Sequence, residues 1–255
     1  MNEQNSGTAR PVGDLAHRRT RDLGDLSIAH GERRAGLAWR LRNFLEHRHR
    51  GMTALTATMI LGRLFGACAA RARLQGVVYR PDWSRLHPEQ ILKLRALLAE
   101  NHDVRDLARG FGGDILDYGL LSTRLVTNNG VAFIVDAFQN LVELENLHFH
   151  GYGTGTNAEA AGDSALQTEL TTQYATDNVR PTGTTTESAA NIYRTVATLS
   201  PDSGGTIAVT EHGIFSQAAT GGGTLLDRSV FSAVNLVAGS DSLQTTYDLT
   251  LTAGG

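Results

Sequence analysis

Three histidines have the residue type and spacing of metal ligands. His148 and His150 are two positions apart in L-H-F-H, so on a strand both imidazoles would face the same way. His212 lies in a later segment that also has the composition of a strand. Imidazoles on facing strands can bind a divalent metal ion. The three histidines therefore form a candidate metal site.

The residues after the histidine pair depart from the pattern of cupin-type metal sandwiches. That pattern places a Glu a few residues after the pair, whereas the first carboxylate here is Glu159. The alternative is that the histidines lie on a solvent-facing or intersubunit face of a strand. A cupin-like metal protein thus stays an alternative, and no bound metal or other cofactor is our main expectation.

Residues 151–157 (G-Y-G-T-G-T-N) have the glycine content of a nucleotide-binding loop but not its other residues. No Lys followed by Ser or Thr is present to reach a phosphate. The dinucleotide loop also requires a βαβ unit with an acidic residue about twenty positions further on, and the surroundings here are rich in predicted strands. We predict instead a tight strand exit at which two backbone segments approach closely.

Residues for nucleophilic catalysis are not arranged in a known pattern. No G-x-S-x-G segment occurs, and Cys68, the single cysteine, stands among alanines. We interpret it as a buried, inert thiol. The carboxylates of the C-terminal half are scattered, and solvated loop charges are the default interpretation for them. The sequence therefore predicts a protein without enzymatic activity.

Three tyrosines are candidates for a binding or assembly surface: Tyr152, Tyr174 and Tyr193. If they were exposed together in one groove, they would favour a receptor-binding or glycan-binding module. This is the main alternative to a purely structural role.

The C-terminal half, from about residue 126, predicts an all-β fold. Short β-branched and aromatic segments are separated by Gly, Asp, Asn and Ser, as in sandwiches and barrels. We predict a mainly β protein with an antiparallel, jelly-roll-like β-sandwich. Its core would take the apolar positions of residues 207–215 and 230–237.

Helices are predicted before and within this half. Residues 88–100 carry one apolar stripe and have Pro88 in the first turn. A shorter helix is expected over 104–108, and residues 158–170 are expected to form a short helix or two turns. A third helix over 131–140, capped by Asn128 or Asn129, would turn Ala132, Val135, Ala137 and Phe138 inward.

The charges divide the chain into two parts of opposite sign. Residues 1–85 hold 15 Arg and no Lys against 7 acidic residues, whereas the remainder holds 8 basic against 19 acidic residues. Residues 1–84 are predicted to be an Arg-rich, disordered or loosely helical arm that contacts nucleic acid or another protein. Alternatively, the reading frame begins too early and Met52 is the true start. No apolar run is long enough for a membrane span, so no membrane partner is expected.

Several C-terminal motifs are similar to those of tailed-bacteriophage virion structural proteins of uncharacterised role. They are V-T-N-N-G-V-A-F-I-V-D-A-F-Q-N, G-Y-G-T-G-T-N, G-D-S-A-L-Q-T-E-L, T-E-H-G-I-F-S and L-L-D-R-S-V-F. The same order of motifs also resembles phage tail-fibre attachment modules. This resemblance covers about residues 114–255.

The resemblance implies a non-enzymatic component of the virion, assembled in the host cytoplasm as a capsid decoration or tail-associated protein. It also implies a homo-oligomer in contact with other virion proteins. Together with the patterns above, it divides the chain into an arm (1–84), a helical linker (85–113) and a β-sandwich virion domain (114–255).

Overall fold

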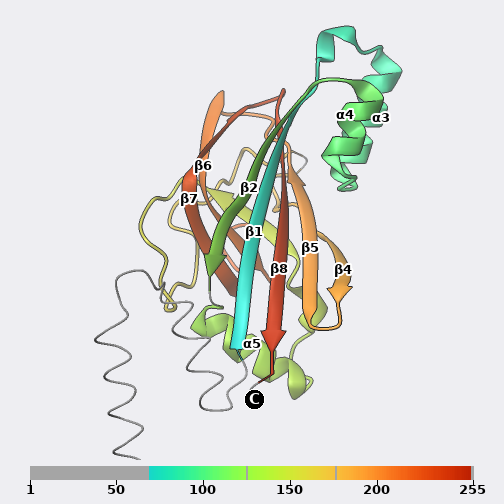
Figure 1. Cartoon of the computed structure of the whole chain (residues 1–255). Coiled ribbons are helices and arrows are strands. Elements are labelled where there is room, and N and C mark those ends of the chain that lie inside the picture. Colours follow the sequence, from blue (N-terminus) through green and yellow to red (C-terminus); the bar gives the residue numbers. More distant parts are fainter. Residues whose placement is uncertain (1–68, 125, 176, 254–255) are drawn as a thin grey trace, which may run out of the picture. The chain divides into compact units, whose positions relative to one another are not determined.

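A computed structural model describes residues 69–253 except 125 and 176. These residues form two antiparallel sheets that pack face to face (Figure 1). The larger sheet has the strand order β2-β1-β8-β5-β4, and the smaller has the order β3-β6-β7. The predicted mainly β fold with an antiparallel sandwich is therefore confirmed. The strands are β1 (Ala69–Arg80), β2 (Asp114–Arg124), β3 (Phe149–Gly153), β4 (Thr184–Ala189), β5 (Ile192–Leu199), β6 (Thr206–Phe215), β7 (Leu225–Val237) and β8 (Ser242–Thr252).

Strand β1 contradicts the predicted division of the chain. It lies inside the larger sheet, between β2 and β8, so the prediction of a disordered or loosely helical arm is wrong for residues 69–80. Its period of two places Ala72, Leu74 and Val78 in the core and leaves Arg71 and Arg73 less buried. Residues 81–84 of the predicted arm lead into a short 3-10 helix. Residues 1–68 lie outside the described part of the chain, and with them Cys68 and the alternative start at Met52.

Two helices form a hairpin on the outer face of the larger sheet. They are α3 (Pro88–Ala99) and α4 (Val104–Phe111), and they follow a short 3-10 helix, η1 (Trp83–Arg85). Leu94, Leu98 and Leu107 pack with Val77 and Tyr79 of β1. The predicted helices are confirmed, but they cover the sheet rather than link two separate parts.

Helix α5 (Asn128–Phe138) lies at the opposite end of the sandwich from α3 and α4 (Figure 1). Its N-cap is Thr127, whose Oγ1 accepts a hydrogen bond from the Gly130 amide at 3.0 Å, rather than Asn128 or Asn129. The predicted inward face is also wrong. Phe133 is buried, whereas Val135 and Phe138 are 48% and 84% exposed, because the helix begins three residues earlier and contacts the sheet through another face.

The space between the sheets holds two apolar layers. One layer surrounds Leu199, Val209 and Leu243, and the other surrounds Leu74, Ile214 and Tyr247. The core prediction is confirmed for Ile207, Val209, Ile214, Phe215, Val234 and Leu236, which are buried. It is wrong for Ala208, Ala233 and Val237, which are exposed. Residues 158–170 form turns that cross the outer face of the smaller sheet, and η2 (Leu144–Asn146) leads into β3.

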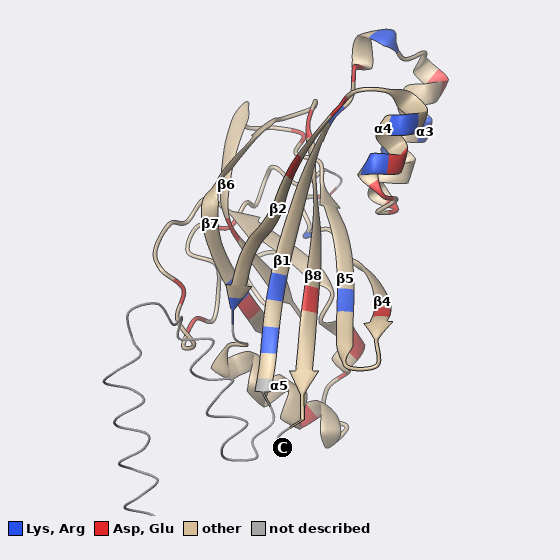
Figure 2. Ribbon diagram, viewed as in Figure 1, with Lys and Arg blue, Asp and Glu red and all other residues tan. Residues whose placement is uncertain are grey.

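The outer face of the larger sheet is charged where the helical hairpin does not cover it. Figure 2 shows basic residues on β1 and β5 and one acidic position on β8. Arg73 and Arg194 are both in register with Asp248, and Arg194 forms a two-pronged ion pair with it at 2.7 and 2.9 Å. This face is therefore solvated rather than part of an apolar contact.

Candidate functional site

Two of the three candidate metal ligands meet between the sheets. Nδ1 of His150, on β3, lies 3.0 Å from Nε2 of His212, on β6. Both residues are fully buried. The other nitrogen of His150 lies 3.1 Å from the Thr195 hydroxyl, and Nδ1 also lies 3.2 Å from the hydroxyl of Thr245. The pair thus joins the smaller sheet to β5 and β8 of the larger one.

His148 does not join this pair. It precedes β3, is only partly buried, and contacts the backbone carbonyl of Glu145 through Nδ1. Among the described residues, no three His, Cys, Asp or Glu side chains are grouped closely enough to hold a metal ion. The three-histidine metal site is therefore not formed. The chain turns at His148 before β3 begins, so His148 does not share a strand face with His150.

Burial keeps both histidines uncharged. It lowers the pKa of His212 to about 3 and, together with the positive charge that His212 could carry, lowers the pKa of His150 well below its ordinary value. A neutral imidazole has one donor and one acceptor nitrogen, so a single N–H···N hydrogen bond can join the two rings. The pair forms a polar layer between the two apolar layers of the core.

An acidic side chain lies in the same interior. Asp227 on β7 is fully buried and accepts a 3.1 Å hydrogen bond from the Ser229 hydroxyl. Its second carboxyl oxygen has no hydrogen-bond partner among the described residues. Burial raises its pKa to about 7, so this carboxyl group holds a proton in mildly acidic solution, when an unfolded aspartate would have lost it.

The predicted tyrosine surface is not on the surface. Tyr152 and Tyr174 are buried, and the amide of Tyr152 donates a hydrogen bond to the Tyr174 hydroxyl at 2.8 Å. Tyr193 is partly buried, and its hydroxyl donates to the carbonyl of Leu147 at 2.9 Å. The three tyrosines therefore act in packing, and the binding surface predicted from them is wrong. That a residue is a tyrosine does not indicate whether its side chain lies on the buried or the exposed face of a strand.

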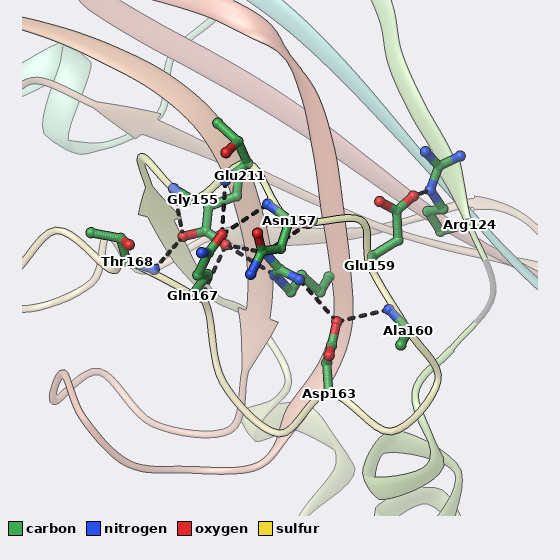
Figure 3. A network of polar contacts seen from close by, with 11 residues as sticks. Arg124, Gly155, Asn157, Glu159, Ala160, Asp163, Gln167, Thr168 and Glu211 are labelled. Atoms are coloured by element: carbon green, nitrogen blue, oxygen red, sulfur yellow. Dashed lines mark hydrogen bonds and ion pairs between the residues drawn. The ribbon is translucent and has the colours of Figure 1, made fainter.

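Three charged residues from three of the C-terminal motifs meet in a largely buried network (Figure 3). Glu211 of the T-E-H-G-I-F motif is fully buried and lies 2.8 Å from Arg228 of the L-L-D-R-S-V-F motif. Its carboxylate also accepts hydrogen bonds from the amides of Gly155, Gln167 and Thr168 at 3.0, 2.9 and 2.7 Å. The strand β6 thus holds both ends of the 154–170 connection.

Arg228 extends the network to the middle of the same connection. It lies 3.0 Å from Asp163 and donates to the carbonyl of Asn157 at 3.2 Å, and Asp163 in turn accepts from the Ala160 amide at 2.9 Å. A buried charge pair with all of these partners is strongly oriented. We name Glu211, Arg228 and Asp163 the loop clamp.

The glycines of the G-x-G-x-G run make the loop clamp possible. A Cβ atom on Gly153 would lie 2.4 Å from the Thr168 carbonyl oxygen, and one on Gly155 would lie 2.5 Å from Oε1 of Glu211. No larger residue fits there without displacing the backbone or the carboxylate. The predicted tight strand exit is confirmed, and its physical reason is the approach of Glu211 and the loop backbone.

A second buried ion pair anchors the end of the connection. Arg180 is almost fully buried and forms a two-pronged pair with Glu169 at 2.5 and 2.9 Å. The same guanidinium group donates to the carbonyls of Gln217 and Gly222 and lies 3.5 Å from the centre of the Phe215 ring. Sequence analysis did not identify this pair, although Glu169 lies within one of the quoted motifs.

Comparisons with known proteins add no family to this picture. The chain matches no protein-family model and no curated protein sequence. Within the described residues, no helix has the length and apolar character needed to cross a membrane. Function must therefore be argued from the geometry, in which the motif residues stabilise the sandwich and its long connection.

Proposed function

We propose that this chain is a non-enzymatic structural subunit of a tailed-bacteriophage virion, assembling on the capsid or the tail as a homo-oligomer. The observation that carries the proposal is the loop clamp. Three of the six charged residues of the phage-like motifs, Glu211, Arg228 and Asp163, bind one another and the backbone of the connection. Their role is to hold a long surface connection in one conformation, as a subunit that docks repeatedly on identical neighbours requires.

The surface that we assign to self-assembly is the outer face of α5. Val131, Val135 and Phe138 are separated by four and three positions, so they share one helix face, and they are 51%, 48% and 84% exposed. Leu141 and Leu144 continue the exposed apolar surface beyond the helix end. Contiguous exposed apolar residues of this kind mark interaction sites.

A second copy of this chain is the occupant that the surface favours. Residues 128–142 contain a single charged side chain, Asp136, so the surface offers no charge pattern for a strongly charged partner. An uncharged apolar strip can pack against its own copy around a two-fold axis. This assignment replaces the predicted tyrosine surface.

Sedimentation of the full chain tests the assembly role. The wild-type protein is expected to self-associate as its concentration rises, and Phe138→Ser and Val131→Ser are expected to shift it toward the monomer. Leu92→Ser is the matched control, because Leu92 is 69% exposed on α3, at the other end of the sandwich, and its loss should leave association unchanged. A wild-type protein that stays monomeric at every concentration contradicts the proposal.

A further inference from the structure

A groove opens between α3 and the loops at that end of the sandwich. Its volume is about 790 Å³, within the range of small-molecule sites. Four segments line it: η1 and α3, the connection before β4, the residues after β5, and the turn between β7 and β8. Loop clusters at one end of a rigid sandwich are common binding sites.

The walls of the groove are held in place by hydrogen bonds. The Trp83 indole donates to the carbonyl of Ser240 at 2.9 Å. Asn101 donates to the carbonyl of Thr182 at 2.9 Å and accepts from the amide of Thr198 at 2.8 Å. The hydroxyls of Ser200 and Ser242 lie 2.7 Å apart. The site is therefore formed before any ligand enters, which reduces the entropy lost on binding.

Three charged side chains line the groove without an ion-pair partner in the described part of the chain: Arg95, Asp177 and Asp202. The guanidinium group of Arg95 lies over the Trp83 ring, 5.6 Å from its centre, so these two side chains form one wall together. The other two charges of the lining are already used, because Asp241 pairs with Arg80 at 3.2 Å and Arg180 pairs with Glu169. Asp177 and its neighbour Asn178 both have positive φ, of 59° and 54°. Successive positive φ angles are what a type I′ turn requires, so the backbone at Asp177 forms a tight turn at the edge of the groove.

The chemistry of these groups selects the class of ligand. Two unpaired carboxylates against one guanidinium group disfavour an anion such as phosphate. The many hydroxyl, amide and carboxylate groups disfavour a purely apolar ligand. Carboxylates accept hydrogen bonds from hydroxyl groups, and Arg donates to oxygen. The partly buried Trp83, with Arg95 over its ring, adds an aromatic wall that a ligand can contact where Arg95 leaves it open. A neutral, polyhydroxylated ligand satisfies all of these groups.

We propose that this groove binds a neutral glycan, through hydrogen bonds to Asp177, Asp202 and Arg95 and contact with Trp83. The proposal gives the chain a ligand-binding activity in addition to assembly. It does not depend on the α5 surface or on the virion assignment, since its residues lie at the opposite end of the sandwich from α5.

Saturation-transfer NMR with the full chain tests the proposal, using maltotriose, mannotriose, chitotriose and lactose as probes. At least one of them is expected to receive saturation and to change the fluorescence of Trp83, one of only two tryptophans in the chain. Asp202→Ala and Asp177→Ala are each expected to weaken that binding about tenfold or more, the effect of losing a hydrogen bond to a charged group.

Lys93→Ala is the matched control, because Lys93 lies on α3 but does not line the groove. Thermal unfolding of each variant shows whether the fold is intact, and both aspartates are exposed, so little loss of stability is expected. Two results overturn the proposal: no saturation of any of the four sugars, or sugar binding that survives in both aspartate variants.

Discussion

Glu211 and Arg228 lie on adjacent strands, and their side chains bind these strands to the connection of residues 154–170. Both are almost completely removed from water, at 0% and 4% exposure. A buried ion pair is weak support for stability as a whole, but removing one partner leaves the other charge buried and unpaired. The network is therefore best tested by removing a single charge.

Arg228→Met is predicted to destabilise the protein by about 3–5 kcal/mol, because Glu211 would stay buried without its cation. Urea unfolding monitored by circular dichroism measures this loss. Arg109→Met is the control, since Arg109 pairs with Asp106 on the exposed surface of α4 and such pairs contribute about 0–1 kcal/mol. Equal losses in the two variants would contradict the structural role assigned to the loop clamp.

The buried histidines and Asp227 predict how stability changes with pH. A histidine whose folded pKa is depressed stabilises the fold above its unfolded pKa of about 6.5 and loses that contribution as the pH falls. Burial raises the pKa of Asp227 to about 7, so its contribution has the opposite sign and is lost as the pH rises. Between about pH 4 and 6, unfolding takes up two protons at His150 and His212 and releases one from Asp227.

The two histidines outweigh Asp227, so together these three groups make the protein less stable as the pH falls in this range. Asp227→Asn removes the proton that unfolding releases, so its stability is expected to fall more steeply on acidification than that of the wild type, by about one further proton. His212→Asn removes one of the protons that unfolding takes up, so its stability is expected to fall less steeply, by about one proton. Urea midpoints at several pH values measure the three slopes, and identical slopes in all three proteins would show that these groups are not buried as described.

The sequence predicted some of the buried contacts around the loop clamp but not others. The tight exit at residues 151–157 followed from glycine spacing, because only close backbone approach explains so many glycines without a phosphate-binding Lys. The pairing of Glu211 with Arg228 did not follow, since they are seventeen positions apart and their contact depends on the register of β6 and β7. The interior position of Tyr152 and Tyr174 was missed because burial depends on which strand face is covered.

Among the secondary-structure elements, β1 is the one that the sequence analysis placed in the wrong part of the chain. It was assigned to the arm, whereas it is an inner strand of the larger sheet. Its high Arg content indicated a solvated arm, yet the arginines alternate with core residues along an inner strand. The period of two was hard to recognise because Ala72 and Gly76 are small and carry little apolar signal. The helices were easier to predict, since their apolar spacing and end residues are local properties.

The inner position of β1 predicts the outcome of two truncations. A chain that starts at Met52 retains β1, so it and the full chain are both expected to unfold cooperatively in urea. A chain that starts at Pro81 lacks β1, so β2 loses its pairing and β8 exposes one edge and part of the core. We expect it to be insoluble or to lose cooperative unfolding. Cooperative unfolding of the Pro81 chain would contradict the sheet order.

At the scale of the whole molecule, the two ends of the sandwich have different properties. The α5 end exposes apolar side chains, whereas the α3 end has a polar groove. A subunit that assembles through one end and presents the other to its surroundings would have this distribution. The fold class was predictable from composition and strand spacing, but the difference between the ends required the packing of α5 and the loops.

Mass spectrometry of purified phage particles decides whether this chain is a component of the virion. Particles produced from the genome that encodes this chain would be purified by density gradient and digested for peptide mapping. The account predicts peptides from residues 69–253 at a constant ratio to the main shell protein in every particle fraction. A chain that is abundant in the lysate but missing from the purified particles would contradict it.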